Sequence, residues 1–169
     1  MVTIRTERTG DCPAIRRVLE QAFGKPDEAD LVDALRRRDA VILSLVATVD
    51  DQVVGHILFT PVTIEGEGSS FHAVGLGPMA VLPPYQNKGV GSKLVCDGLQ
   101  KCGEAGHEIV VVVGHPNYYP RFGFTSAKSR GIQWEFDVPD EVFMVIELRE
   151  GGLAGRKGVV RYQPEFSSV

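Results

Sequence analysis

The sequence of 169 residues has little cysteine and no long apolar run. Its three cysteines (Cys12, Cys96 and Cys102) form no CxxC pair, and an odd number fits no secreted disulfide framework. The apolar stretch 109–113 is far shorter than the roughly 20 residues that a membrane-spanning helix needs. Charged residues within 1–8 stand where a signal peptide needs an apolar segment. These absences predict a cytoplasmic protein that has no membrane as a partner.

Basic residues are also scarce relative to acidic ones. Eighteen Lys and Arg against 22 Asp and Glu give a net charge of −4, so the basic surplus typical of nucleic-acid binding is absent. We therefore expect no nucleic acid among the partners. The length is typical of one domain, and we expect residues 1–169 to form a single domain.

Apolar spacing predicts helices over 11–24, 27–38 and 89–103. In the first, Ile15, Val18 and Leu19 begin an apolar stripe at i, i+3 and i+4. Asp11 precedes that stripe and is expected to cap the helix, while Gly24 is expected to end it.

Runs of β-branched and aromatic residues predict the strands between and after these helices. The runs 41–49 and 52–60 flank Asp50-Asp51, which predicts a hairpin, and 61–70 is a loop or a second short hairpin. Further strands are expected over 71–82, 108–113, 124–134, 142–148 and 159–162. Strands 71–82 and 108–113, with the helix between them, form a βαβ unit and are therefore expected to be parallel. Pro78 predicts an irregularity inside the first of them.

The segment Gln86-Asn-Lys-Gly89-Val-Gly91 joins a strand to a helix and is the strongest chemical signal. Amides at a helix start lack intrahelical partners and carry the positive end of the dipole, and glycine lets an anion approach them. A phosphate or pyrophosphate site is therefore predicted; a glycine-tolerant helix start without a ligand is the alternative. The spacing matches neither a dinucleotide GxGxxG nor a Walker GK[ST] loop.

Two motifs together resemble a known family. The segment 79–94 (MAVLPPYQNKGVGSKL) is similar to the acyl-CoA-binding motif of the GNAT superfamily of N-acetyltransferases, and Tyr119-Pro-Arg-Phe-Gly123-Phe124 is similar to its downstream signature. The bacterial subgroup carrying GHPxYYPRFGF matches 114–124. The resemblance implies a mixed α/β fold: a mostly antiparallel sheet containing a parallel βαβ unit and a splayed strand pair, with helices on both faces.

The resemblance also implies acetyl-CoA as co-substrate, without a metal. Pantetheine would pair with the strand at Met79, Ala80 and Val81. The pyrophosphate would bind the backbone of Gln86, Asn87, Lys88, Gly89, Val90, Gly91 and Ser92. Many relatives place an asparagine seven residues before the tyrosine, where this chain has Val112. Asn117 is the substitute contact that we expect.

Tyr119 matches the family position that protonates the departing CoA thiolate. Tyr118 is the alternative acid, and a packing role with the hydroxyl on a backbone carbonyl is the alternative function for Tyr119. For the base, which must accept a proton from the amine, His115 is the best placed candidate because it follows a strand end. The other candidates are His72, His56 and Glu28. For His56 a structural role is favoured, and for Glu28 helix capping.

The resemblance implies acetyl transfer to a primary amine by direct attack in a ternary complex. A backbone N–H near Val81 would hold the oxyanion. The acceptor is a small-molecule amine or a protein amine, and a homodimer is compatible with the family. Two other functions stay open from the sequence: a non-catalytic acyl-CoA sensor or interaction module, and a loop that binds a nucleotide instead of CoA.

Overall fold

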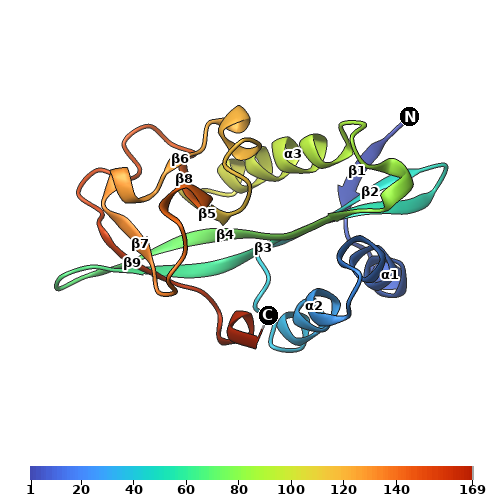
Figure 1. Ribbon diagram of the computed structural model, residues 1–169, viewed down its shortest axis with the longest axis horizontal. Helices are drawn as coiled ribbons and strands as arrows, with labels where there is room; N and C mark the ends of the chain where they lie inside the picture. Colours follow the sequence, from blue (N-terminus) through green and yellow to red (C-terminus); the bar gives the residue numbers. More distant parts are fainter. Residues whose placement is uncertain (169) are drawn as a thin grey trace. The chain divides into compact units, whose positions relative to one another are not determined.

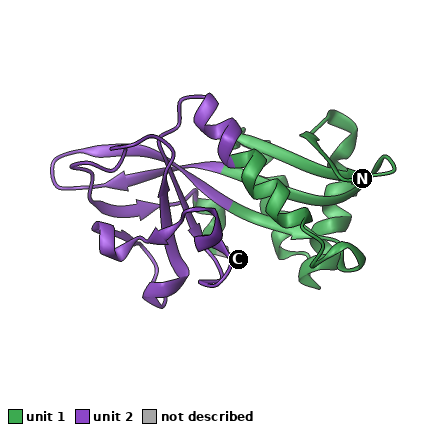
Figure 2. Cartoon of the chain, turned by 90° about the horizontal axis from the view of Figure 1, so that it is seen from above, with its two compact units in different colours: residues 1–59, 77–98, 164–169 green, residues 60–76, 99–163 purple. Residues whose placement is uncertain are grey.

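The computed structural model describes residues 1–168 and contains two compact units (Figure 2). The first unit comprises residues 1–59, 77–98 and the C-terminal turn from Pro164; the second comprises 60–76 and 99–163. Three elements pass from one unit into the other: β3 (Gln52–Glu65), β4 (Ser70–Val81) and α3 (Val90–Glu104). The expectation of a single domain stays a prediction.

In the first unit, antiparallel strands lie between helices. The order β1-β2-β3 joins strands β1 (Thr3–Thr6) and β2 (Leu43–Val49) to the first half of β3. Figure 1 shows α1 (Cys12–Phe23) and α2 (Asp27–Arg37) on one face of these strands and the beginning of α3 on the other. The predicted helices are confirmed to within about two residues at their ends.

The capping role expected of Asp11 is wrong. Asp11 does precede α1, but no side-chain hydrogen bond caps that helix. Its carboxylate instead accepts from Arg5 Nη1 at 2.7 Å and from the Arg8 backbone N–H at 2.7 Å. A nearby guanidinium and a free amide thus compete successfully for the carboxylate. Gly24 ends α1 as predicted, in the left-handed conformation with φ 71°.

Both hairpins are present. Asp50 and Asp51 form the first turn with φ of 49° and 62°, the left-handed values that a two-residue hairpin loop requires. Beyond it, β3 continues to Glu65 and β4 begins at Ser70, so the segment left open between a loop and a hairpin is a hairpin.

The second unit contains the parallel strand pair. There β4 pairs in parallel with β5 (Ile109–Val113), from Val74↔Val110 to Leu76↔Val112, as the βαβ unit predicts. Strand β5 pairs antiparallel with β8 (Phe143–Glu147), which pairs with β6 (Thr125–Ser126). The pairing of β4 with β5 ends at Leu76, whereas β4 itself continues through Gly77 and Pro78. Pro78 has no N–H to donate at that point, and the Gly77–Pro78 peptide is cis.

The long strand expected over 124–134 is wrong. The chain leaves β6, makes a 3-10 turn at Lys128–Arg130 and enters β7 (Ile132–Trp134). The Ile132 N–H donates to the Ala127 carbonyl at 3.0 Å and closes this loop, with both side chains buried. Strand β7 pairs in parallel with β9 (Gly158–Arg161), which also pairs antiparallel with the end of β3.

The core of the second unit is built from strand side chains of β3, β4, β5, β8 and β9. They are joined by Ile132 and Leu153, with Trp134 and Tyr162 packed against them. In the part of the chain that the structure describes, no helix is long and apolar enough to cross a membrane.

Candidate functional site

The predicted anion-binding loop connects β4 to α3 in the first unit. Residues 86–89 are exposed, and Asn87 and Gly89 adopt left-handed φ values of 60° and 84°. The first helical hydrogen bond of this region joins the Lys93 N–H to the Gly89 carbonyl at 3.1 Å. Because the amides of Val90 and Gly91 lie in the first turn, they have no intrahelical acceptor. The loop therefore presents N–H groups and the positive dipole end to solvent, which suits a phosphate group.

The end of β4 is oriented by its pairing with β3. The Leu82 N–H donates to the Val54 carbonyl of β3 at 2.8 Å. Successive backbone groups of a strand alternate in direction, so the N–H and C=O of Val81 point away from β3. The Gln86 side chain confirms that direction because its Nε2 donates to the Val81 carbonyl at 2.8 Å. Sequence reasoning placed Gln86 on the pyrophosphate and missed this bond.

In the second unit, His115, Asn117 and Tyr119 follow the end of β5. The N–H groups of Tyr118 and Tyr119 donate to the His115 carbonyl at 3.1 and 3.4 Å, which begins the 3-10 helix Tyr119–Phe122. The backbone of His115 thus positions both tyrosines. The side chains of His115 and Asn117 are exposed.

The ring of Tyr119 is buried in an aromatic cluster. It is 7% exposed, and its centroid lies 5.7 Å from that of Phe124 and 5.1 Å from that of Tyr118. Gly114 makes room for it, since a Cβ on that residue would lie 2.3 Å from Tyr119 Cε2. This contact was not predicted; the glycine directly after a buried strand is the only signal of it in the sequence.

Burial raises the pKa of the Tyr119 phenol to about 12, with a smaller contribution from Tyr118. Within residues 1–168, no protein group hydrogen-bonds the Tyr119 hydroxyl, so the alternative of a hydroxyl anchored on a backbone carbonyl is wrong. Tyr118 differs, because the Arg121 guanidinium lies 4.3 Å from its ring centroid.

The four candidate bases differ in their exposure. His72 on β4 and His115 are exposed. His56 is 0% exposed and bonded to Ser44 Oγ at 2.9 Å, so it reaches no substrate and is structural. Glu28 is 9% exposed in the first turn of α2, with Lys25 Nζ 3.7 Å from its Oε2.

The residues predicted for the site therefore form two groups, one in each unit. Residues 79–81 and 86–92 belong to the first unit, and 115, 117 and 119 to the second. Among residues 1–168, no three His, Cys, Asp or Glu side chains gather as metal ligands.

Comparisons with known proteins agree with this fold. The family model described as "Acetyltransferase (GNAT) domain" matches residues 3–127. The chain is 36% identical over 165 residues to the uncharacterized N-acetyltransferase YhbS of Escherichia coli, covering 97% of this chain and 98% of that protein. The crystal structure of YhbS in complex with CoA superimposes with a TM-score of 0.93 at 35% identity, over 98% of this chain and 92% of that one. A GNAT family acetyltransferase from Brucella melitensis in complex with acetyl-CoA gives a TM-score of 0.80 at 37% identity, over 98% of each chain.

Proposed function

The chain belongs to the GNAT family of N-acetyltransferases, and on this premise we propose that it transfers the acetyl group of acetyl-CoA to a primary amine by direct attack in a ternary complex. The observation that carries the proposal is the exposed loop before α3. Its left-handed Asn87 and Gly89 present helix-start amides, which is the arrangement that a pyrophosphate requires. Relatives bound to CoA and acetyl-CoA support the same ligand for this chain.

In this proposal the backbone of 86–92 holds the pyrophosphate, with Asn117 as a further contact. The outward N–H groups of Met79 and Val81, on either side of Ala80, pair with the pantetheine amides as an added strand would. The N–H of Val81 then donates to the thioester oxygen and stabilises the oxyanion as the amine attacks.

Proton movements complete the reaction. The attacking amine must be neutral and loses a proton after attack, for which we assign His115 as acceptor. The C–S bond breaks, leaving the amide and the CoA thiolate. A free thiol has a pKa near 8.5, well below the value of about 12 for Tyr119. Complete proton transfer from Tyr119 is therefore uphill, and the phenol acts chiefly as a hydrogen-bond donor to the thiolate.

Titration calorimetry with acetyl-CoA tests the loop. Gly89→Glu places a carboxylate where the anion should bind and is expected to abolish saturable binding. Gly106→Glu is the matched control: both glycines have left-handed φ, 84° and 94°, with no atom within 4 Å of an added Cβ. Control binding equal to that of the unmodified chain, with none in Gly89→Glu, supports the site. Equal binding in both variants would overturn it.

A further inference from the structure

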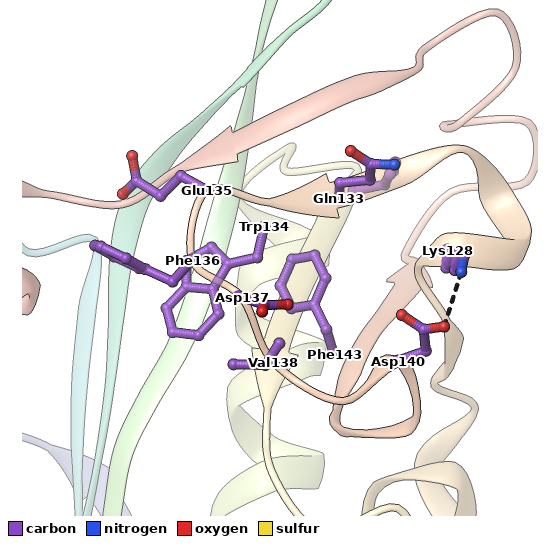
Figure 3. A pocket seen from close by; sticks show the side chains of 10 residues that line it. Lys128, Gln133, Trp134, Glu135, Phe136, Asp137, Val138, Asp140 and Phe143 are labelled. Atoms are coloured by element: carbon purple, nitrogen blue, oxygen red, sulfur yellow. Dashed lines mark hydrogen bonds and ion pairs between the residues drawn. The ribbon is translucent and has the colours of Figure 1, made fainter.

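A pocket of about 370 Å³ lies in the second unit, between β7 and the start of β8 (Figure 3). Aromatic rings line it. The Trp134 indole stacks on the Phe143 ring with centroids 6.0 Å apart and 19° between planes, and the Phe136 ring meets the indole edge-on at 5.0 Å. This volume is at the low end for ligand pockets, so it suits one end of a ligand.

The charged residues lining the pocket leave one carboxylate uncompensated. Arg161 Nη1 lies 3.0 Å from Glu135, and Lys128 Nζ lies 2.9 Å from Asp140. Asp137 is exposed and has no ion-pair partner within residues 1–168. Among the residues that the structure describes, no cation pairs with this carboxylate, so the pocket keeps a negative charge.

The geometry points to an organic cation as the occupant of this pocket: the acceptor carries an ammonium or methylated ammonium group in addition to the amine that is acetylated. This inference rests on the proposed function. In Figure 3 the Asp137 carboxylate lies between the Trp134 and Phe143 side chains in that view, whereas Glu135 points away. Aromatic faces attract cations, most strongly that of tryptophan, and an adjacent carboxylate adds to that attraction.

The pocket adjoins the segment that carries Tyr119. Phe143 pairs with Val113, the last residue of β5. The N–H of the next residue, Gly114, donates to the Val142 carbonyl at 2.9 Å. The Tyr119 ring packs against that same Gly114. A cation anchored on Phe143 therefore leaves the other end of the acceptor close to the proposed acid.

The acceptor needs two amino groups because one must be neutral in order to react and the other must be charged in order to bind the pocket. The reacting amine must be neutral to attack a thioester, whereas a group held by Asp137 and the aromatic faces stays charged. A monoamine would place its only nitrogen in the pocket, away from the thioester. A diamine fills the pocket with one end and presents the other.

Binding can be measured without turnover because Trp134 is the one tryptophan of the chain. Its fluorescence is titrated with choline and with 3,3-dimethyl-1-butanol, the uncharged carbon analogue. We expect a saturable change with choline only. Asp137→Asn should weaken choline binding roughly three- to five-fold, and Asp137→Lys more than that. Glu141→Gln, an exposed neighbour outside the pocket lining, is the control and should leave binding unchanged.

Turnover tests the connection to the acceptor. Thiol release from acetyl-CoA is followed with 1,6-diaminohexane and with hexylamine. The diamine should be the better substrate, and Asp137→Asn should raise its KM by the same factor that weakens choline binding, with kcat unchanged. Because hexylamine enters the pocket only in an unproductive orientation, Asp137→Asn should raise its KM and kcat together and leave its kcat/KM unchanged.

Each result separates the pocket from the acetyltransferase activity. No choline-dependent fluorescence change in the folded protein overturns the cation site, even if amines are acetylated. Choline binding with a diamine KM indifferent to Asp137→Asn overturns the acceptor assignment and leaves the proposed function intact. Absence of both acetyl-CoA binding and thiol release overturns the proposed function, and the acceptor assignment with it.

Discussion

At the scale of single residues, removing the hydroxyl of Tyr119 is expected to change the rate of acetyl transfer without changing the stability of the fold. Tyr119→Phe keeps the buried ring and removes a hydroxyl that no protein group hydrogen-bonds within residues 1–168. Its unfolding free energy should therefore change by less than about 0.5 kcal/mol. Because a hydrogen bond to a charged group contributes about 1.5–3 kcal/mol, kcat should fall roughly 10- to 100-fold.

Tyr118→Phe is the matched control because it removes the same atom from the adjacent residue. Thiol-release kinetics and acetyl-CoA affinity are measured for both variants. A loss of kcat confined to Tyr118→Phe would transfer the acid role to that residue. Equal activity in both variants would show that neither phenol assists the leaving group.

A side chain at Gly114 is predicted to lower activity because it would displace the Tyr119 ring. In Gly114→Ala the new Cβ would lie 2.3 Å from Tyr119 Cε2, so the ring must move. Such overpacking costs about 1–3 kcal/mol, and displacement of the phenol should lower kcat more than acetyl-CoA affinity. Thermal unfolding and kinetics measure the two effects. Gly10→Ala, where an added Cβ meets nothing within 4 Å, should change neither; a Gly114→Ala variant as stable and active as that control contradicts the prediction.

The candidate site was predictable where one segment carries the whole signal. The loop 86–92 combines glycines, a preceding strand and a helix start, so its exposed position before α3 follows from local chemistry, while its role in anion binding stays a proposal. The bond from Gln86 to Val81 and the fit of Tyr119 on Gly114 depend on how the folded backbone turns. No residue pattern specifies such contacts. The cation pocket is similar, since β7 and β8 bring Trp134 onto Phe143.

At the scale of elements, helices and strands were predicted correctly where the pattern of apolar residues extends over a long segment. An apolar stripe identified α1, α2 and α3, and an unbroken apolar run identified β5. It failed over 124–134, because β6 and β7 are too short to show alternation. Strand β7 exists through its pairing with β9, from Ile132↔Gly158 onward, and that partner is remote in sequence.

In helix α3, replacing two glycines by alanine is predicted to change the free energy of unfolding in opposite directions. At Gly98 an added Cβ would lie 2.3 Å from Cζ of Phe59, which is fully buried and has no room to move. Gly98→Ala should therefore destabilise the fold by about 1–3 kcal/mol, despite the better helix propensity of alanine. At exposed Gly103 the nearest atom is 3.9 Å away, and Gly103→Ala should stabilise by about 0.5–1 kcal/mol. Urea unfolding of both variants checks this; the same sign for both would contradict it.

At the scale of the whole molecule, a polar network that is buried at His56 and Ser44 and half-buried at Glu7 and Arg36 connects several elements of the first unit. His56 on β3 bonds to Ser44 Oγ at 2.9 Å, Ser44 donates to Glu7 Oε1 at 2.6 Å, and Arg36 of α2 donates to the same carboxylate at 2.7 Å. Since the Ser44 hydroxyl donates to Glu7, it accepts from His56 Nε2–H. His56 Nδ1 is buried without a partner, so the neutral imidazole is the form that fits.

This network predicts how the stability of the protein depends on pH. Burial lowers the pKa of His56 to about 3, against about 6.5 in the unfolded chain. Above pH 6.5 both states are neutral and stability is full. As the pH falls below 6.5, the unfolded chain takes up a proton that the fold excludes, so unfolding becomes easier by about 1.4 kcal/mol per pH unit.

The carboxylates add to this loss at lower pH. Hydrogen bonds from Arg36 and Ser44 lower the pKa of Glu7 despite its burial, and Arg5 lowers that of Asp11 to about 2. Their stabilisation is present above their unfolded pKa values, near 4, and is lost as the pH falls through the folded ones. Between pH 6.5 and about 4.5, therefore, protonation of His56 in the unfolded chain is the change within this set that lowers stability.

His56→Gln separates the two ranges, because its side-chain amide can still donate to Ser44 Oγ but cannot take up a proton. Urea unfolding from pH 7.5 to 4.5 should show the unmodified chain losing about 2–3 kcal/mol below pH 6.5, whereas the variant stays nearly flat. Comparing slopes removes any constant cost of the substitution. Parallel curves would mean that the imidazole is protonated in the folded protein, and the assignment of His56 as a neutral, structural residue would then be wrong.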